Sequence, residues 1–176
     1  MATQTLPRQQ AKVAGFVDFL PGTHVIPAER VKEIYEEHKH RIYSLAFWMT
    51  DNELEAEELS TSTFRRAFSA TPKPSGEQID RALIAELREN RPIGVLTLSC
   101  EQAKQVHQVR TNTMRVHLER AVVQLPATER LIFLLHDVAR RDHASIARLI
   151  GLREAESING LHQARLRMRE LLAAMV

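Results

Sequence analysis

The sequence predicts an all-α fold of two small helical domains joined by a linker, and three observations support this prediction. Apolar residues recur at intervals of three and four over several long stretches, which is the repeat of amphipathic helices. Only six Gly and seven Pro interrupt the 176 residues. A chain of this length, 44% hydrophobic and 26% charged, can bury one ordinary core or two small ones.

Composition also narrows the class of protein. A net charge of +2 permits contact with nucleic acid without requiring it. The single cysteine, Cys100, excludes an intramolecular disulfide and a cysteine-rich metal site, which fits a reducing cytoplasm. The most apolar N-terminal stretch, "VAGFVDFL", is short and interrupted by Asp18. We therefore expect a cytoplasmic protein without a secretory signal or a membrane span.

The first domain is predicted over residues 28–98. Residues 1–27 read as an N-terminal extension, because "MATQTLPRQQ" is polar and "LPGTHVIP" contains turn-forming residues. A helix is expected from Ala28 to Met49, and Asp51 or Asn52 is placed to cap a second helix over residues 53–68. A loop over residues 69–78 and a third helix over residues 79–90 are expected to follow.

The helical pattern stops after the third helix. The stretch "RPIGVLTLSC", residues 91–100, contains Pro92, Gly94 and a run of β-favouring residues. Helical spacing resumes at about Glu101, and we expect residues 99–117 to form a linker helix between the domains.

The second domain is predicted over residues 118–176 as four helices. Pro126 marks the start of the second of these helices, and Asp142 is placed to cap the third. Gly151 supplies a tight turn before the last, so the final pair forms a helix-turn-helix, a unit that can hold one helix in the major groove of DNA. The expected inward stripe of the last helix is Ile158, Leu161, Met168, Leu171 and Leu172. The residues expected to face outward are Arg153, Asn159, Gln163, Arg165, Arg167 and Arg169.

Three submotifs of this domain stand in a recognisable order. They are "LPATER" at a helix junction, "SIARLIG" on the supporting helix and "LHQARLRMRELL" on the last helix. Together they resemble the promoter-binding C-terminal domain of bacterial sigma factors of the extracytoplasmic-function (ECF) type. The resemblance covers roughly a third of the chain. It implies DNA contacts from Arg153, Glu156, Ser157, Asn159, Gly160, Gln163 and Arg165.

The second helix resembles the polymerase-binding core of the same family. The sequence "EAEEL", residues 55–59, is followed by an aromatic and basic segment, as in that family, where the helix binds the largest polymerase subunits. The implied polymerase contacts are Glu55, Glu57, Glu58, Thr61 and Arg65. Thr61 stands where the family commonly has Gln. Alone, an acidic helix is more often a solvated face, but its position upstream of the sigma-like segment favours polymerase binding.

The chain also departs from the family pattern. Leu83 stands where the family has an aromatic residue, and residues 91–100 replace a basic helix that opens promoter DNA. Unpaired bases are captured by aromatic stacking along a basic groove, and this stretch offers little of that chemistry. In the last helix, cations of the family pattern are replaced by Ile158, Gly160 and Gln163, while Glu156 adds a carboxylate. Both the melting surface and the DNA-reading surface are expected to be weakened.

Two functions remain open from the sequence. The first is an ECF-type sigma factor that binds core RNA polymerase and promoter DNA, with an anti-sigma factor as a further candidate partner. The alternative is a sigma-like regulator that binds polymerase or another sigma factor and has lost promoter melting. No catalytic motif occurs, so we expect neither an enzyme nor a cofactor. A metal site at His136 and His143, with Asp137 and Asp142 nearby, is only a weak candidate.

Overall fold

The computed structural model of the chain describes residues 27–99 and 115–175, and within these ranges every regular element is a helix and no strand occurs. In chain order the elements are α2 (Ala28–Thr50), α3 (Glu53–Ala70), α4 (Gly76–Asn90), α5 (Arg115–Val123), α6 (Ala127–Phe133), η2 (Leu134–Val138), α7 (His143–Ile150) and α8 (Glu154–Ala174). The all-α prediction is confirmed. Residues 1–26 of the predicted extension and residues 100–114 of the predicted linker lie outside the described residues.

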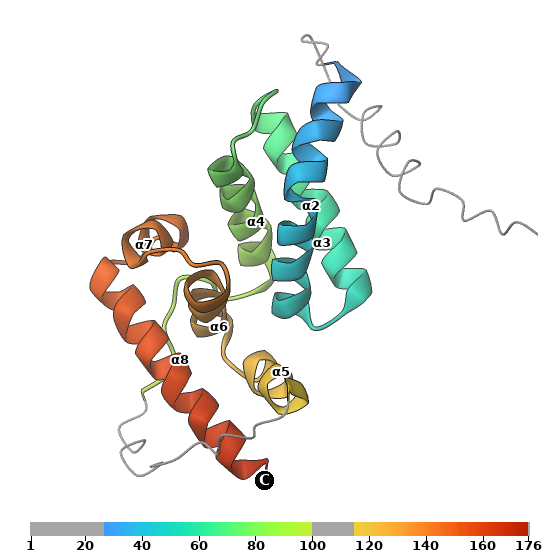
Figure 1. The fold of residues 1–176 in the computed structure, drawn as a ribbon. Coiled ribbons are helices and arrows are strands. Elements are labelled where there is room, and N and C mark those ends of the chain that lie inside the picture. The colour runs from blue at the N-terminus through green and yellow to red at the C-terminus, as the bar shows by residue number, and fades with distance from the viewer. Residues whose placement is uncertain (1–26, 100–114, 176) are drawn as a thin grey trace, which may run out of the picture.

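Helices α2, α3 and α4 pack side by side as the N-terminal half (Figure 1). As the apolar spacing predicted, α2 buries one face, made of Val31, Ile42, Leu45, Ala46 and Met49. The facing residues of α3 are Ala56, Thr63, Phe64, Ala67 and Phe68. Those of α4 are Ile79, Asp80, Ala82, Leu83, Ile84 and Leu87. The buried set therefore includes one carboxylate, Asp80, which apolar spacing could not reveal.

The caps show why the helices begin and end where they do. Asp51 ends α2 in the left-handed conformation, with φ 55°, and Asn52 caps α3 by accepting a hydrogen bond from the Glu55 amide at 3.1 Å. Helix α4 begins earlier than predicted, because Ser75 and Gln78 form a reciprocal capping box. The loop predicted over residues 69–78 is therefore shorter, since Gly76 is already helical.

Helices α5 to α8 form the C-terminal half, with α6 continuing into the single π-helical turn η2 (Figure 1). The predicted helix-turn-helix is α7 and α8. The Asp142 side chain caps α7 by accepting from the Ser145 amide at 2.8 Å. Gly151 has φ 75°, a conformation that favours glycine, so the turn forms at the predicted position.

Polar contacts join the two halves. The Asp80 carboxylate, 2% exposed, accepts hydrogen bonds from Arg41 of α2 and from Arg141 just before α7. Arg130 of α6 donates to the carbonyl oxygens of Trp48 and Met49 at the end of α2, at 3.4 and 3.2 Å. The buried apolar side chains of both halves also belong to one cluster. The halves therefore pack directly against each other.

Residues 91–99 run between the halves without regular structure, as the break in the helical pattern predicted. Ile93 is buried, whereas Val95 is 59% exposed. The segment thus passes over the surface with alternate residues turned inward.

Candidate functional site

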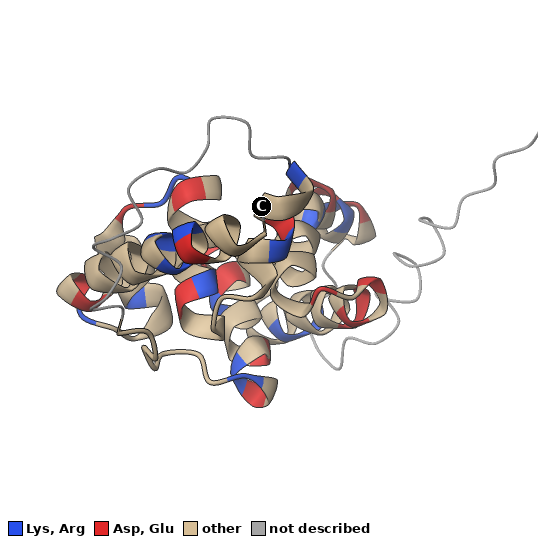
Figure 2. Cartoon of the chain, turned by 90° about the horizontal axis from the view of Figure 1, so that it is seen from below, with Lys and Arg blue, Asp and Glu red and all other residues tan. Residues whose placement is uncertain are grey.

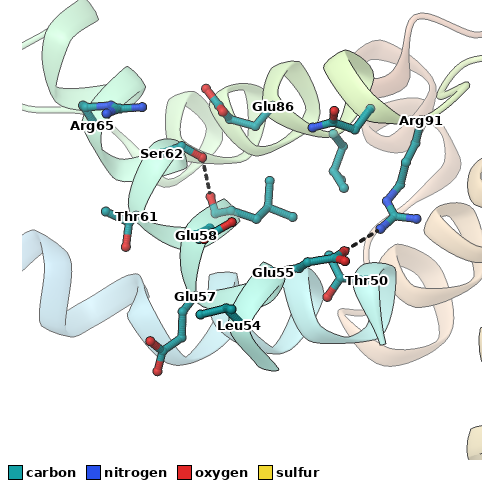
Figure 3. A pocket seen from close by; sticks show the side chains of 13 residues that line it. Thr50, Leu54, Glu55, Glu57, Glu58, Thr61, Ser62, Arg65, Glu86 and Arg91 are labelled. Atoms are coloured by element: carbon teal, nitrogen blue, oxygen red, sulfur yellow. Dashed lines mark hydrogen bonds and ion pairs between the residues drawn. The ribbon is translucent and has the colours of Figure 1, made fainter. Parts of the chain in front are cut away.

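A groove of about 830 Å³ lies between α3 and the C-terminal end of α4. It is lined by Thr50, Leu54, Glu55, Glu57, Glu58, Leu59, Thr61, Ser62, Arg65, Glu86, Leu87, Asn90 and Arg91 (Figure 3). All five residues that the sequence predicts as polymerase contacts are in this lining. The structure thus brings together a set that the sequence could place only on one helix.

The amphipathic pattern of α3 turns these residues outward. Ala56, Phe64 and Phe68 are buried against α2 and α4, so positions 55, 58, 61 and 65, about one turn apart, lie along the opposite side. Glu55, Glu57, Glu58, Thr61 and Arg65 are all exposed. These five side chains therefore lie on the surface of the molecule.

The groove carries more negative than positive side chains, because four glutamates line it against two arginines. Arg91, from the end of α4, reaches across to Glu55 at 3.4 Å, whereas Arg65 lies at the opposite end of the groove (Figure 3). Glu86 is engaged by Arg66 at 2.5 Å. The surface therefore suits a partner that presents cationic side chains.

Eight residues of this groove are not among the predicted contacts, and Leu54, Glu86 and Arg91 are the most informative of them. Leu54 begins the lining on α3 and is 67% exposed, the largest exposed fraction among the described large apolar residues. Glu86 and Arg91 come from α4, and only tertiary packing places them beside α3. The sequence did contain a signal for Leu54. It is an apolar residue among glutamates in the first turn of α3, and its position does not fit the spacing of the buried stripe.

Helix α8 exposes only part of the DNA-contact set that the resemblance implied. Arg153, Asn159 and Arg165 are exposed, while Glu156 and Gln163 are half-buried. Ser157 and Gly160, which the resemblance also implied as DNA contacts, are buried. The Ser157 hydroxyl instead pairs with Nδ1 of His143 at 3.0 Å.

Gly160 faces inward because α8 packs closely there. A Cβ atom at this position would lie 2.7 Å from Ile132 Cδ1 and 2.8 Å from Leu96 Cδ2. The missing side chain therefore makes room for the neighbouring apolar side chains of Ile132 and Leu96. Ile158 was predicted to join the inward stripe but is 51% exposed, because the buried stripe runs through Leu161, Ala164, Met168 and Leu172.

Most cations on α8 are paired with carboxylates. Arg153 contacts Glu156 at 2.8 Å, Arg165 contacts Asp137 at 2.6 Å, and Arg167 contacts Glu170 at 3.0 Å. Figure 2 shows Lys and Arg positions interspersed with Asp and Glu positions along the helices. Within the described chain, Arg169 alone among the α8 arginines lacks a partner. The phosphate-binding capacity of this helix is thus reduced.

The Asp137 pair also shifts pKa values. Burial acts to raise the pKa of Asp137, but hydrogen bonds from Arg165 and His136 outweigh it and hold the pKa below its ordinary value. The same hydrogen bond raises the pKa of Arg165. Both groups stay charged at neutral pH, so the pair joins η2 to α8 as an ion pair.

The two histidines of the weak metal candidate form a stacked pair. The rings of His136 and His143 have centroids 4.5 Å apart and an interplanar angle of 22°. His136 Nδ1 pairs with Asp137 at 2.8 Å. Within residues 27–99 and 115–175, no group of three His, Cys, Asp or Glu side chains is placed to hold a metal ion. Within the described residues, the two histidines therefore stack on each other and form hydrogen bonds.

No protein-family model matches the sequence, and no curated protein matches it either. In the part of the chain that the structure describes, no helix has the length and apolar character needed to cross a membrane.

Proposed function

We propose that this protein acts in bacterial transcription initiation as an ECF-type sigma factor in the cytoplasm. It binds core RNA polymerase through the groove between α3 and α4 and contacts promoter DNA with α7 and α8. The observation that carries this proposal is the groove itself, because five residues chosen for their resemblance to polymerase contacts all line one exposed surface.

The chemistry of the groove supports a protein partner. Glu55, Glu57 and Glu58 are matched by cations on a partner, and the exposed Leu54 offers an apolar contact at the rim. Interfaces that combine an apolar anchor with surrounding charges gain both affinity and orientation. An ion pair within the groove, between Arg91 and Glu55, is then exchanged for contacts with the partner.

A second candidate function is a sigma-like regulator that binds polymerase or another sigma factor without opening promoter DNA. It is favoured by the pairing of Arg153, Arg165 and Arg167 with carboxylates and by the inward position of Gly160. Leu83, at the position of the family's aromatic residue, is 2% exposed, so it offers no stacking surface to an unpaired base.

Polymerase binding is tested by reversing two groove charges. The double variant Glu57→Lys and Glu58→Lys is expected to reduce retention of purified core polymerase on the tagged full-length chain at least tenfold, because cations would face cations. The matched control is Glu36→Lys with Glu37→Lys, an adjacent acidic pair on α2 that does not line the groove. Equal retention of polymerase by the wild type, the groove variant and the control variant would show that the groove does not bind polymerase.

Transcription separates the two candidate functions. Core polymerase loaded with the full-length chain is supplied with genomic promoter fragments, and both run-off transcripts and permanganate-reactive thymines are measured. A sigma factor produces transcripts and open thymines. A regulator that binds polymerase produces neither, yet it still requires Glu57 and Glu58 for retention.

A further inference from the structure

Residues 92–98 are held to the C-terminal half mainly through their backbone. The Thr128 hydroxyl donates to the Pro92 carbonyl oxygen at 2.9 Å and accepts from the Gly94 amide at 3.1 Å. One carboxylate oxygen of Glu129 accepts from the Thr97 and Leu98 amides at 2.5 and 2.7 Å. Two neighbouring side chains in the first turn of α6 thus bind four backbone groups of an irregular segment, in which Ile93 and Gly94 form a turn and Gly94 has φ 103°.

The inward side chains of the segment fit a prepared surface. Leu96 Cδ2 lies over Gly160 of α8, 2.8 Å from where a Cβ would stand, and Ile132 of α6 borders the same space. Leu96 and Leu98 pack against the core cluster, while Val95 is exposed. Thr97 is exposed as well, but its hydroxyl donates a hydrogen bond to Glu129 Oε1 at 3.3 Å. Thr128, Glu129, Ile132 and Gly160 form what we name the α6–α8 surface. A glycine on α8 is what lets the leucine approach the helix closely.

Glu129 is the unusual member of this surface. Its side chain is fully buried, and its second carboxylate oxygen, Oε2, has no hydrogen-bond partner within the described chain. A buried carboxylate is costly unless it is hydrogen-bonded, so the amides of residues 97 and 98, together with the Thr97 hydroxyl, compensate its burial. The surface therefore needs the backbone of residues 97 and 98 in place, and Glu129 Oε2 remains as a further acceptor.

Backbone hydrogen bonds with pockets for alternate side chains are a general mode of recognising extended peptides. In that mode the backbone supplies affinity, and the alternating side chains supply specificity. Most of the contacts described above are of one of these two kinds, and the hydrogen bond from the Thr97 hydroxyl to Glu129 adds a polar side-chain contact. None of them depends on the covalent continuity of residues 92–98 with the helices on either side.

We propose that the α6–α8 surface is a peptide-binding site for a segment of the pattern Gly-x-Leu-x-Leu in the turn-containing conformation that residues 92–98 adopt. In this structure its ligand is the chain's own residues 92–98, and the site accepts the same sequence from outside when the internal segment is weakened. This inference is independent of the proposed function, since it concerns neither the α3–α4 groove nor DNA.

The test uses the full-length chain and a labelled peptide of residues 91–99, "RPIGVLTLS". In the variant Leu96→Asp with Leu98→Asp the internal segment should leave its site. Fluorescence anisotropy is expected to show saturable peptide binding to this variant, with at least tenfold weaker binding to the wild type, whose site is occupied. A peptide carrying the same two aspartates is the matched control and should not bind.

A second substitution locates the binding. Adding Glu129→Leu to the Leu96→Asp and Leu98→Asp variant should weaken peptide binding at least tenfold, because the two amides lose their acceptor. The control is Glu154→Leu, an exposed glutamate on α8, which should leave binding unchanged. If the double aspartate variant loses its helical circular dichroism, Thr97→Pro replaces it, since this exposed residue then loses its amide donor. The proposal is overturned if no folded variant binds the peptide, or if Glu129→Leu leaves the peptide affinity unchanged.

Discussion

At the scale of single residues, the polar network around His143 connects the two helices of the helix-turn-helix. His143 is the first residue of α7, stacks on His136 and pairs with the buried Ser157 of α8. Burial lowers the pKa of His143, and the charge of His136 and of Arg165 lowers it further, while Glu154 and Asp137 act in the opposite direction. The neutral imidazole is therefore the form that the fold favours.

This arrangement predicts a pH-dependent stability. The ordinary pKa of 6.5 applies to the unfolded chain, whereas the folded pKa lies below it. As pH falls through about 6.5, the unfolded chain takes up a proton that the folded chain does not, so the free energy of unfolding decreases. Above that pH both forms are neutral and the contribution vanishes. Urea denaturation at pH 7.5 and 5.5 should show a smaller loss for His143→Gln than for the wild type. If the free energy of unfolding falls equally in the two proteins between pH 7.5 and 5.5, His143 is not the group responsible for the pH dependence.

At the scale of elements, α8 is a helix whose outward cations are already neutralised. Arg153, Arg165 and Arg167 each contact a carboxylate, and Ile158 stands exposed between them along the chain. An added cation at an exposed position of α8 has no assigned partner and can meet a phosphate. Ile158 is therefore the position at which the orientation of this helix toward DNA can be tested without disturbing the core.

Ile158→Arg is predicted to tighten binding to a fixed DNA duplex if α8 faces DNA. Each new phosphate contact should steepen the slope of log K against log salt by about 0.9. Leu54→Arg is the matched control, because it adds the same charge at an exposed apolar residue on α3. An unchanged slope for Ile158→Arg, or an equal change in the control, would show that α8 does not contact DNA and would favour the regulator.

At the scale of the whole molecule, buried polar groups hold the two helical halves together. Asp80 binds Arg41 and Arg141, and Arg88 of α4 donates to the Ile150 carbonyl oxygen at the end of α7 at 2.5 Å. Burial lowers the pKa of Arg130, and the nearby charge of Arg91 adds to the effect. The contacts of Arg88 with Ile150 and of Arg130 with Trp48 and Met49 satisfy backbone carbonyls at helix ends, which otherwise lack partners.

Removing the Asp80 charge is predicted to destabilise the whole chain. Asp80→Asn should lower the free energy of unfolding by roughly 1.5–3 kcal/mol, the range for a hydrogen bond to a charged group. Urea denaturation is followed by circular dichroism and by fluorescence of Trp48, the only tryptophan of the sequence. Coincident transitions in the wild type would indicate that the halves unfold together. Glu77→Gln, which removes an exposed pair with Arg81, is the control and should cost less than about 1 kcal/mol. Equal losses for the two variants would refute a special role for Asp80.

The sequence alone determined the features that depend on neighbours along the chain. The helices, their inward apolar faces, the Asp142 cap and the Gly151 turn follow from residue type and spacing over a few positions. The five predicted groove residues of α3 came from the resemblance to the family's polymerase-binding helix, and they lie together because they share one helix face, whereas Leu54 of the same helix was missed. The early start of α4 was also readable, because Ser75 and Gln78 have the spacing of a capping box.

Tertiary structure decided what each ambiguous residue contacts. From the sequence, Gly160 could lie on the inward or the outward face of its helix. The structure shows that it faces inward, because Leu96 and Ile132 pack beside it. Asp80 and Glu129 resemble surface carboxylates in the sequence, yet both are buried, because Arg41, Arg141 and the amides of residues 97 and 98 reach them from distant positions. Local spacing sets which side of a helix is apolar. The contacts of a buried polar side chain or of a glycine depend on packing between segments separated by tens of residues. Residue spacing within one helix does not reveal this packing.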